Sequence, residues 1–516
     1  MKIKMKLKIK NIHIAIIIIG IIFNCISIFH PNLWFDEAYS VGLANKSFTD
    51  IWKIGGNDVH PILYYWILHI IYLITNSSIE GSIIAYRIFS AVCISILGIL
   101  GFTHIRKDFG EKTGALFSFF SYFLPVICIY AAEVRMYSLS LLLVTILAIY
   151  AYRLAKGNNL KENNNKNENN SVKNWIIFAT SSLLCIYSHY YGLMAAGIIN
   201  CILLGYFIKQ KQKSSIIKIL SFGAIQLLAY IPWILYFMKQ LKNVSKGFWI
   251  GFEFPKTPME LLGVQYTGNL ENTAGFIVAM LLYIYVGYRI YKTIKEEKNK
   301  ENKQENKQYK YAITSAIIYF TVIFAAVIVT IALKTSIVYY RYLVVITGLY
   351  IFFISYFISK EKNKYIIGII CTVTVIMAGF SNYKQVKEAY DSNNMTQISY
   401  LKENVQPDDV IVFDESNFGT GSVVSLYFTN NKQIYYNPSN WGVEEAYKAF
   451  GEQLKIYTNT DFLNECTGRV WIIDNQNSDY YNKIFKNENF KVISQKVINT
   501  KYKGYVYNLI LVDKEK

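Results

Sequence analysis

The segment that decides the fold is IHIAIIIIGIIFNCISIF, residues 12–29, which is followed directly by HPNLWFDEAY, residues 30–39. An apolar run of this length is typical of a helix that crosses a bilayer. Five lysines precede it, and no small-residue cleavage site stands before His30. We therefore interpret the run as a retained first span and not as a secretory signal.

The composition indicates that lipid surrounds most of the chain. Of its 516 residues, 53% are hydrophobic and 17% are charged, and the mean hydropathy is +0.23. Water-soluble globular domains rarely show these values together. The formal net charge is +18, but the lysines occur in short groups between long apolar runs, as in the cytoplasmic loops of membrane proteins. A nucleic-acid partner is therefore not expected.

Apolar runs long enough to span a membrane continue up to residue 380. They cover residues 83–105, 113–131, 136–154, 175–187, 192–208, 216–237, 273–291, 312–333, 343–358 and 365–380. With the first run, they predict an α-helical polytopic protein with about 11 transmembrane helices in residues 1–380.

The distribution of cations predicts the orientation, because Lys and Arg near the ends of spans prefer the cytoplasm. With the N-terminus inside, the basic segments fall on the inner side: 2–10, 106–107, 153–173, 209–218, 289–310 and 360–364. The Lys/Asn/Glu-rich stretches 155–174 and 292–310 are then disordered cytoplasmic linkers. This predicts a multi-pass protein of the cell (plasma) membrane with a cytoplasmic N-terminus and an extracytoplasmic C-terminal region.

Residues 381–516 differ in composition from the rest and are predicted to form a soluble, extracytoplasmic α/β domain. A helical stretch at 395–404 runs into Pro407, and strand-like runs follow at 410–413, 470–473 and 505–512. The region has no Gly-rich phosphate loop. We interpret it as an accessory or acceptor-presenting module.

The outer loop 30–82 contains the first candidate site residues. Asp36 and Glu37 stand at the predicted membrane face, where a partly desolvated carboxylate can accept a proton from a hydroxyl group. The alternative is that Asp36 caps a helix beginning at Glu37. Asp58 and His60 follow in the same loop, ahead of an aromatic stretch that fits a helix lying in the interface.

Two further outer loops contain polar residues at the membrane boundary, Glu133 and Arg135 in one and His189 in the other. Ionisable groups at this depth are costly unless they are paired or used, which indicates a site. A structural Glu133–Arg135 ion pair and a satisfied interfacial imidazole are the alternatives.

Lys334 and Arg341 lie at the outer ends of the ninth and tenth predicted spans. Both can bind a phosphate, Arg through a two-point contact. Snorkelling of the long side chains to the interface is the alternative.

Five motifs in order resemble those of bacterial and archaeal membrane glycosyltransferases of the GT-C fold. The most similar groups are the protein O-mannosyltransferase-like family, glycosyltransferase family 39, and the lipid A aminoarabinose transferases. The resemblance covers residues 12–380. It rests on D-E at 36–37, D-x-H-P-x-x-Y-Y at 58–65, E-x-R-x-Y at 133–137, H-Y-Y at 189–191 and R-Y-L at 341–343.

This resemblance implies an inverting transfer of a hexosyl or pentosyl group from a polyprenyl-phosphate donor to a lipid, glycan or protein acceptor in the cell envelope. It implies that Asp36 is the general base or acceptor-orienting carboxylate, with Glu37 as its partner. The implied acceptor and sugar side consists of Asp58, His60, His189 and Tyr190. The implied donor phosphate-binding residues are Arg135, Tyr137, Arg341 and Lys334.

Two further points concern the proline pattern of the family and the possible use of a metal. The family often has two consecutive prolines where this chain has Pro61-Ile62, which leaves the local backbone path open. Some GT-C enzymes use a divalent metal. Asp36, Asp58, His60 and His189 are candidate ligands, although no ligand spacing demands a metal.

Two other functions are compatible with a polytopic chain. A transporter or flippase for lipid-linked sugars would need polar residues along a path through the bilayer, whereas the charges inside the predicted spans are chiefly Arg87 and Lys218, both close to span ends. A non-catalytic scaffold that displays the C-terminal domain would not need the outer-face carboxylates.

Overall fold

The structure is a computed structural model that describes residues 2–76, 78–157, 166–268, 272–298, 308–390, 395–440, 444–475, 479–486, 488–500 and 502–514. The chain divides into two compact units. The helical unit consists of Met1–Ile26, Ile88–Ala132 and Met136–Tyr383. The mixed unit consists of Ser27–Arg87, Glu133–Arg135 and Lys384–Lys516.

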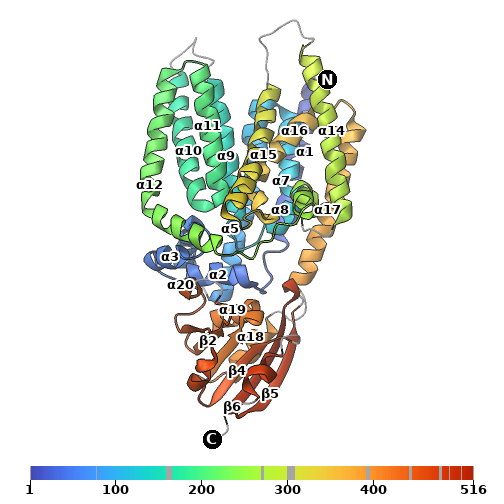
Figure 1. Cartoon of the computed structure of the whole chain (residues 1–516). Helices are drawn as coiled ribbons and strands as arrows, with labels where there is room; N and C mark the ends of the chain where they lie inside the picture. The colour runs from blue at the N-terminus through green and yellow to red at the C-terminus, as the bar shows by residue number, and fades with distance from the viewer. Residues whose placement is uncertain are drawn as a thin grey trace. The chain divides into compact units, whose positions relative to one another are not determined.

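Long helices make up the helical unit (Figure 1). The first part of the chain supplies α1 (Lys2–Cys25), α5 (Ile79–Leu100), a π-helical turn (Gly101–Ile105), α6 (Arg106–Phe109), α7 (Glu111–Phe123), α8 (Pro125–Tyr130) and α9 (Tyr137–Gly157). The middle supplies α10 (Lys166–Ser188), α11 (Tyr190–Lys209), α12 (Lys213–Ser245), α13 (Lys256–Thr267) and α14 (Thr273–Lys298). The last part supplies α15 (Gln308–Leu333), a 3₁₀ segment (Tyr340–Ile346), α16 (Thr347–Ser359) and α17 (Lys364–Ala389).

Eight helical segments among the described residues are long and apolar enough to cross a membrane. They are Ile79–Phe109, Tyr137–Gly157, Tyr190–Lys209, Lys213–Ser245, Thr273–Glu296, Gln308–Leu333, Tyr340–Ser359 and Lys364–Ala389. The chain is therefore a multi-pass membrane protein. The predicted class, an α-helical polytopic protein with a C-terminal α/β region, is confirmed.

The three remaining predicted spans are helical but do not meet that criterion. In α1 the described apolar part is short, Ile9–Cys25. The run expected at 113–131 is not continuous, because Leu124 is extended and Pro125 begins a new helix, α8. A proline inside a helix removes a hydrogen bond and restricts the residue before it, so the break falls at this point.

The helices also extend into the stretches predicted as linkers. Helix α10 begins at Lys166, and α14 continues to Lys298. The end of α14 is rich in Lys and Glu, which are good helix formers, so this helix can continue beyond its apolar part. The rest of the two predicted linkers, 158–165 and 299–307, lies outside the described residues.

Two glycines allow α1, α5 and α7 to approach one another closely. The ring of Tyr122 in α7 lies against Gly20 and Gly98, where an added Cβ would be 2.3 and 2.1 Å from ring atoms. The Tyr122 hydroxyl donates to the Ser95 carbonyl oxygen at 2.8 Å. Small residues at helix contacts are the usual basis of close packing inside membranes.

Three helices of the segment 30–82 belong to the mixed unit: α2 (Phe35–Ala44), α3 (Phe48–Gly55) and α4 (Leu63–Thr75). Ser47 caps α3 by accepting a hydrogen bond from the Asp50 backbone N–H. Helix α4 buries Tyr64, Tyr65, Leu68 and His69. Its opposite side exposes large apolar residues, Ile70, Leu73 and Ile74, as a helix lying in a membrane interface does.

A six-stranded mixed sheet forms most of the C-terminal region, with the strand order β3-β2-β1-β4-β6-β5. The strands are β1 (Val410–Asp414), β2 (Lys432–Tyr436), β3 (Leu454–Tyr457), β4 (Arg469–Asp474), β5 (Phe490–Asn499) and β6 (Val506–Lys514). The first four are parallel, and β6 and β5 add in antiparallel pairing. The connecting helical segments are α18 (Thr396–Asn404), the turn Glu415–Asn417, α19 (Phe418–Tyr427), α20 (Glu444–Tyr447), Thr460–Glu465, Tyr481–Phe485 and Tyr502–Gly504.

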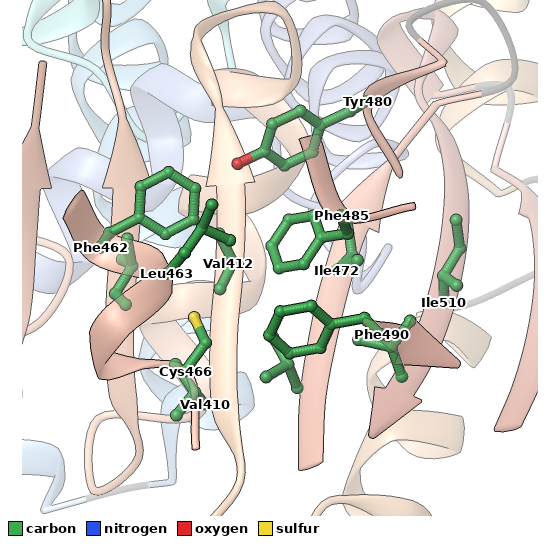
Figure 2. Close-up of a cluster of buried hydrophobic side chains, with 13 residues drawn as sticks. Val410, Val412, Phe462, Leu463, Cys466, Ile472, Tyr480, Phe485, Phe490 and Ile510 are labelled. Atoms are coloured by element: carbon green, nitrogen blue, oxygen red, sulfur yellow. The ribbon is translucent and has the colours of Figure 1, made fainter. Parts of the chain in front are cut away.

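One face of this sheet has its own hydrophobic core (Figure 2). Alternate strand residues such as Val410, Val412 and Ile472 point to this face, as the two-residue period of a strand requires. Helical segments cover them with Phe462 and Phe485, both fully buried. The region therefore holds a core separate from the membrane helices.

Candidate functional site

Helix α2 presents the Asp36-Glu37 pair in its first turn. Trp34 is the N-cap residue, and the helix begins at Phe35. Asp36 is therefore already inside the helix, and the alternative that it caps a helix beginning at Glu37 is wrong. Carboxylates in a first turn interact favourably with the positive end of the helix dipole.

Glu37 is almost completely enclosed. Its side chain is 1% exposed and forms an ion pair with Arg87 at 3.2 Å. It also accepts hydrogen bonds from the Val134 backbone N–H at 3.1 Å and from the Tyr502 hydroxyl at 3.2 Å. These contacts join the segment 30–82, the 133–135 segment and the C-terminal region within the mixed unit. Glu37 thus has the surroundings of a buried structural carboxylate.

Arg87 is fully buried and fixes the backbone ahead of α2. It donates hydrogen bonds to the carbonyl oxygens of His30 and, at 2.8 Å, Asn32. Burial, and next the Arg87 and Lys503 charges, lower the pKa of His30 to about 2. His30 is therefore neutral and does not compete with Arg87 for the negative charge of Glu37.

Asp36 has the opposite environment from its neighbour. Its side chain is 18% exposed, and its carboxylate lies 3.9 Å from Nε of Arg135. Arg135 is 5% exposed and donates to the Asp36 carbonyl oxygen at 3.2 Å and to Ser40 Oγ at 3.4 Å. A further contact, at 3.5 Å, joins Arg135 to the Tyr65 hydroxyl. Asp36 is thus a solvent-accessible carboxylate beside a fixed cation.

Asp58 completes this charged group. Burial, and secondarily the Asp36 charge, raise the pKa of Asp58 to about 6, although the Arg135 charge and a hydrogen bond from the Val59 backbone oppose the shift. Asp58 is therefore partly protonated at mildly acidic pH, whereas a free aspartate would be fully charged. Such a perturbed carboxyl group beside a second carboxylate is typical of functional sites.

The other predicted residues of the mixed unit lie in or beside this group. His60 is buried in the turn between α3 and α4. Glu133 is buried, and its carbonyl oxygen accepts from the Arg135 backbone N–H at 2.8 Å. Arg135 forms an ion pair with Asp36. Among the described residues, no group of three or more His, Cys, Asp or Glu side chains is arranged to hold a metal ion.

In the helical unit, His189 and Tyr137 come together. His189 is the N-cap of α11 and accepts a hydrogen bond at Nδ1 from the Tyr191 backbone N–H. Its ring lies 5.9 Å from the Tyr137 ring and 5.1 Å from the Tyr342 ring. The acceptor role of Nδ1 places the proton of neutral His189 on Nε2.

Tyr190 points toward α12 and has packing contacts there. Its hydroxyl donates to Gln240 and accepts from the Trp233 indole N–H at 3.3 Å. These bonds join α11 to α12 near the ends of both helices. They give Tyr190 a structural role within the helical unit.

Arg341 and Lys334 have different surroundings. The Arg341 guanidinium lies over the rings of Tyr339 and Trp249, 4.7 and 5.6 Å from the two centroids, which holds a planar cation in place. Lys334 is exposed and has a left-handed backbone conformation just after α15. Of these two predicted phosphate-binding residues, Arg341 is the more rigidly held.

Two residues of the site were not predicted from the sequence. In the sequence, Arg87 is a charge near a span end, and a single cation in an apolar run is a signal in itself. Tyr502 contacts Glu37 from 465 positions along the chain. No local pattern links the two, so this contact could not be predicted.

The fold and these contacts define a class of protein: a multi-pass membrane protein with a charged group on the loop after its first helix and a C-terminal mixed sheet. No protein-family model and no curated protein matches the chain. Among solved structures, it is similar to two crystal structures of ArnT from Cupriavidus metallidurans, one in the apo state and one bound to undecaprenyl phosphate. In each case 10% of residues are identical, 97% of both chains is covered, and the TM-score is 0.48.

Proposed function

We propose that the chain is an inverting glycosyltransferase that moves a sugar from a polyprenyl-phosphate donor to a hydroxyl group of a lipid, glycan or protein acceptor on the outer face of the membrane. The observation that carries this proposal is the Asp36–Arg135 pair, in which an accessible carboxylate lies 3.9 Å from a buried guanidinium. A base for the acceptor and a cation for the phosphate are the two groups that this reaction needs.

The proposed reaction is a single displacement at the anomeric carbon. Asp36 accepts the proton of the acceptor hydroxyl as the oxygen forms a bond to that carbon. The bond between the carbon and the phosphate oxygen breaks, and its electron pair leaves with the polyprenyl phosphate. Arg135 stabilises the negative charge that develops on this leaving group.

In this proposal, Glu37 and Arg87 are positioning residues that do not touch the reacting atoms. Their buried ion pair fixes the start of α2, and so the direction in which Asp36 points. Asp58 lies on the acceptor side with His60. A partly protonated Asp58 can donate a hydrogen bond to a sugar hydroxyl as well as accept one.

The remaining predicted residues complete the proposed roles. Arg341, held by Trp249 and Tyr339, and the exposed Lys334 are proposed to bind the donor phosphate. Tyr137 and His189 are proposed to contact the donor and the transferred sugar. The neutral tautomer of His189, with its proton on Nε2, suits a hydrogen bond to a sugar oxygen. Tyr190 is proposed to position His189 next to it.

A transfer assay with a matched pair of variants tests the proposal. Membranes that contain the wild type, Asp36→Asn or Asp50→Asn are incubated with a pool of radiolabelled polyprenyl-phosphate sugars. Asp50 is the control because it is an exposed aspartate in the first turn of α3, the next helix of the same loop. We expect transfer to fall at least about 100-fold in Asp36→Asn and to stay unchanged in Asp50→Asn.

Equal transfer by a folded and inserted Asp36→Asn protein would refute the role of the carboxylate. Movement of labelled carrier lipid across vesicles, without any transfer product, would instead favour the transporter. Thermal unfolding of each purified variant in detergent shows whether a loss of transfer reflects chemistry or misfolding.

A further inference from the structure

The C-terminal sheet has a topological switch point between β1 and β4. This place is separate from the charged group on α2. The chain leaves β1 for β2 on one side, while β4 pairs with β1 in parallel on the other. Adjacent parallel strands whose connections run in opposite directions leave a crevice at their carboxyl ends, and ligands bind there in open α/β sheets. Asp414 ends β1 and Asp474 ends β4 at this edge.

A hydrogen-bond network organises the crevice. The Asn417 side-chain N–H groups donate to Asp414 at 2.7 Å and to Asp474 at 3.1 Å. The Asn475 amide donates to the Asn417 side-chain oxygen at 2.6 Å. Both carboxylates thus accept hydrogen bonds from the Asn417 amide, which joins the two loops.

A pocket of about 320 Å³ opens over this network. Its lining includes Ser416, Asn417, Thr420, Asn475 and Tyr505. The described lining residues contribute hydroxyls, amides and an aromatic ring, and none of them is Lys, Arg, Asp or Glu. Its volume is at the lower end of the range for small-molecule pockets, roughly 300–1,000 Å³.

A second, more open pocket shares Ser416 with the first. It is lined by Glu415, Ser416, Phe418, Tyr435 and Ser439 and has a volume of about 540 Å³. Glu415 accepts hydrogen bonds from the Ser439 backbone and hydroxyl at 3.1 and 2.9 Å. Polar groups and aromatic rings therefore continue beyond the first pocket.

Tyr505 connects the first pocket to the α2 carboxylates within the mixed unit. Its hydroxyl accepts a hydrogen bond from the backbone N–H of Phe35, the residue before Asp36, at 3.1 Å. The close approach of the ring requires a glycine at position 419, where an added Cβ would lie 2.6 Å from the Tyr505 hydroxyl. A molecule in this pocket thus lies beside a tyrosine that touches the helix of the proposed base.

We propose that this pocket binds an uncharged saccharide unit of the acceptor and so presents a neighbouring hydroxyl to Asp36. The inference rests on the proposed function for its role, but the binding itself does not depend on transfer. Hydroxyl and amide groups that both donate and accept match the hydroxyls of a sugar, and an aromatic ring offers an apolar surface. A phosphate or a nucleotide would require the cations or the Gly-rich loop that bind such groups elsewhere.

Direct binding to the full chain tests the inference. The protein in lipid nanodiscs is titrated with glucose, galactose, mannose and N-acetylglucosamine, and with glucose 6-phosphate as a charged comparison, by saturation-transfer NMR. We expect at least one uncharged sugar to bind. Ser416→Tyr should weaken that binding by about tenfold or more, because it fills the pocket and removes polar contacts. Ser399→Tyr, the same change at an exposed position of α18, should leave it unchanged.

Binding that is equal in Ser416→Tyr and Ser399→Tyr, or stronger for glucose 6-phosphate than for every uncharged sugar, would overturn the inference. If Ser416→Tyr does not fold, Asn475→Ala tests the same pocket by removing an amide. Asp36→Asn separates the two proposals: it should keep the saccharide signal while losing transfer. The wild type could transfer sugar while no saccharide binding depends on Ser416. That result would leave the proposed function intact and refute the saccharide pocket.

Discussion

Asp36 and Glu37 are neighbours in the chain but have different chemical surroundings. Glu37 has an arginine, a tyrosine hydroxyl and a backbone N–H as partners and is 1% exposed. Asp36 is 18% exposed and stands beside Arg135. Successive residues of a helix point about 100° apart, so one can face the interior while the other faces the site. The residue-level predictions follow from this difference.

Glu37→Gln is expected to lower stability more than Asp36→Asn does. It leaves the Arg87 charge buried without its counter-ion, which typically costs about 3–5 kcal/mol. Thermal or denaturant unfolding of the detergent-purified proteins measures the difference. The double variant Glu37→Gln/Arg87→Met should be more stable than Glu37→Gln alone, because it removes the uncompensated charge. Equal stability of Glu37→Gln and the wild type would show that the pair contributes nothing to the fold.

Asp58→Asn is expected to stabilise the protein at neutral pH but not at acidic pH. The pKa of Asp58 is about 6 in the folded chain and 3.8 when free, so the folded state binds this proton more tightly. The stability that Asp58 contributes is therefore lost as the pH rises from about 4 to about 6. At pH 7.5 the variant should be more stable by at most about 3 kcal/mol, and at pH 4 it should match the wild type.

The matched control for this pH experiment is Asp50→Asn, which changes an exposed aspartate of the same loop. Unfolding curves at both pH values should show no pH-dependent gain for this variant. A gain for Asp58→Asn that is the same at pH 4 and pH 7.5 would contradict the raised pKa and would point to a packing effect instead.

At this scale, the sequence is informative about which residue types gather but not about their separate environments. The order of the motifs predicts that Asp36, Asp58 and Arg135 belong to one site, and the structure places them in one charged group of the mixed unit. Which carboxylate is enclosed depends on Arg87 and Tyr502. These partners come from distant parts of the chain, where no sequence period links them to α2.

At the scale of elements, the close packing of α1, α5 and α7 yields a third prediction. Gly98→Ala should destabilise the protein by about 1–3 kcal/mol, because the new methyl group meets the Tyr122 ring. The matched control is Gly197→Ala in α11, where nothing lies within 4 Å of an added Cβ. That variant should be neutral or slightly stabilising, since alanine favours the helix.

Unfolding temperatures of the two glycine variants provide the measurement. A Tyr122→Leu background should reduce the cost of Gly98→Ala, because the smaller side chain leaves space for the methyl group. If the two alanine variants are equally stable, the close contact at Gly98 does not limit the packing of these helices.

Elements with a strong hydrophobic pattern could be predicted, and those without one could not. Long apolar runs identify most membrane helices, and α18, β1, β4 and β6 match the predicted C-terminal elements. Strand β3 has only four residues, and β5 is largely exposed. Neither carries an apolar run, because each lies at an edge of the sheet. Their positions depend on pairing with strands that are distant in sequence.

For the whole molecule, the pattern of basic loops predicts opposite sides of the membrane for the C-terminal sheet and the α11–α12 turn. Both proposals depend on this prediction, since they place the transfer reaction and the saccharide pocket outside the cytoplasm. Cysteines at exposed positions can report the side directly. Ser439 lies at the second pocket of the sheet, and Lys211 lies in the turn between α11 and α12.

In intact cells, a membrane-impermeant maleimide should label Ser439→Cys and leave Lys211→Cys unlabelled. After permeabilisation both should react, which controls for accessibility. Both variants are made in a protein that carries Cys201→Ser. All native cysteines lie among the described residues, and of these only Cys201 is exposed. If Lys211→Cys but not Ser439→Cys is labelled in intact cells, the orientation is the opposite of the predicted one. Asp36 would then face the cytoplasm, and a donor presented at the outer face could not reach it.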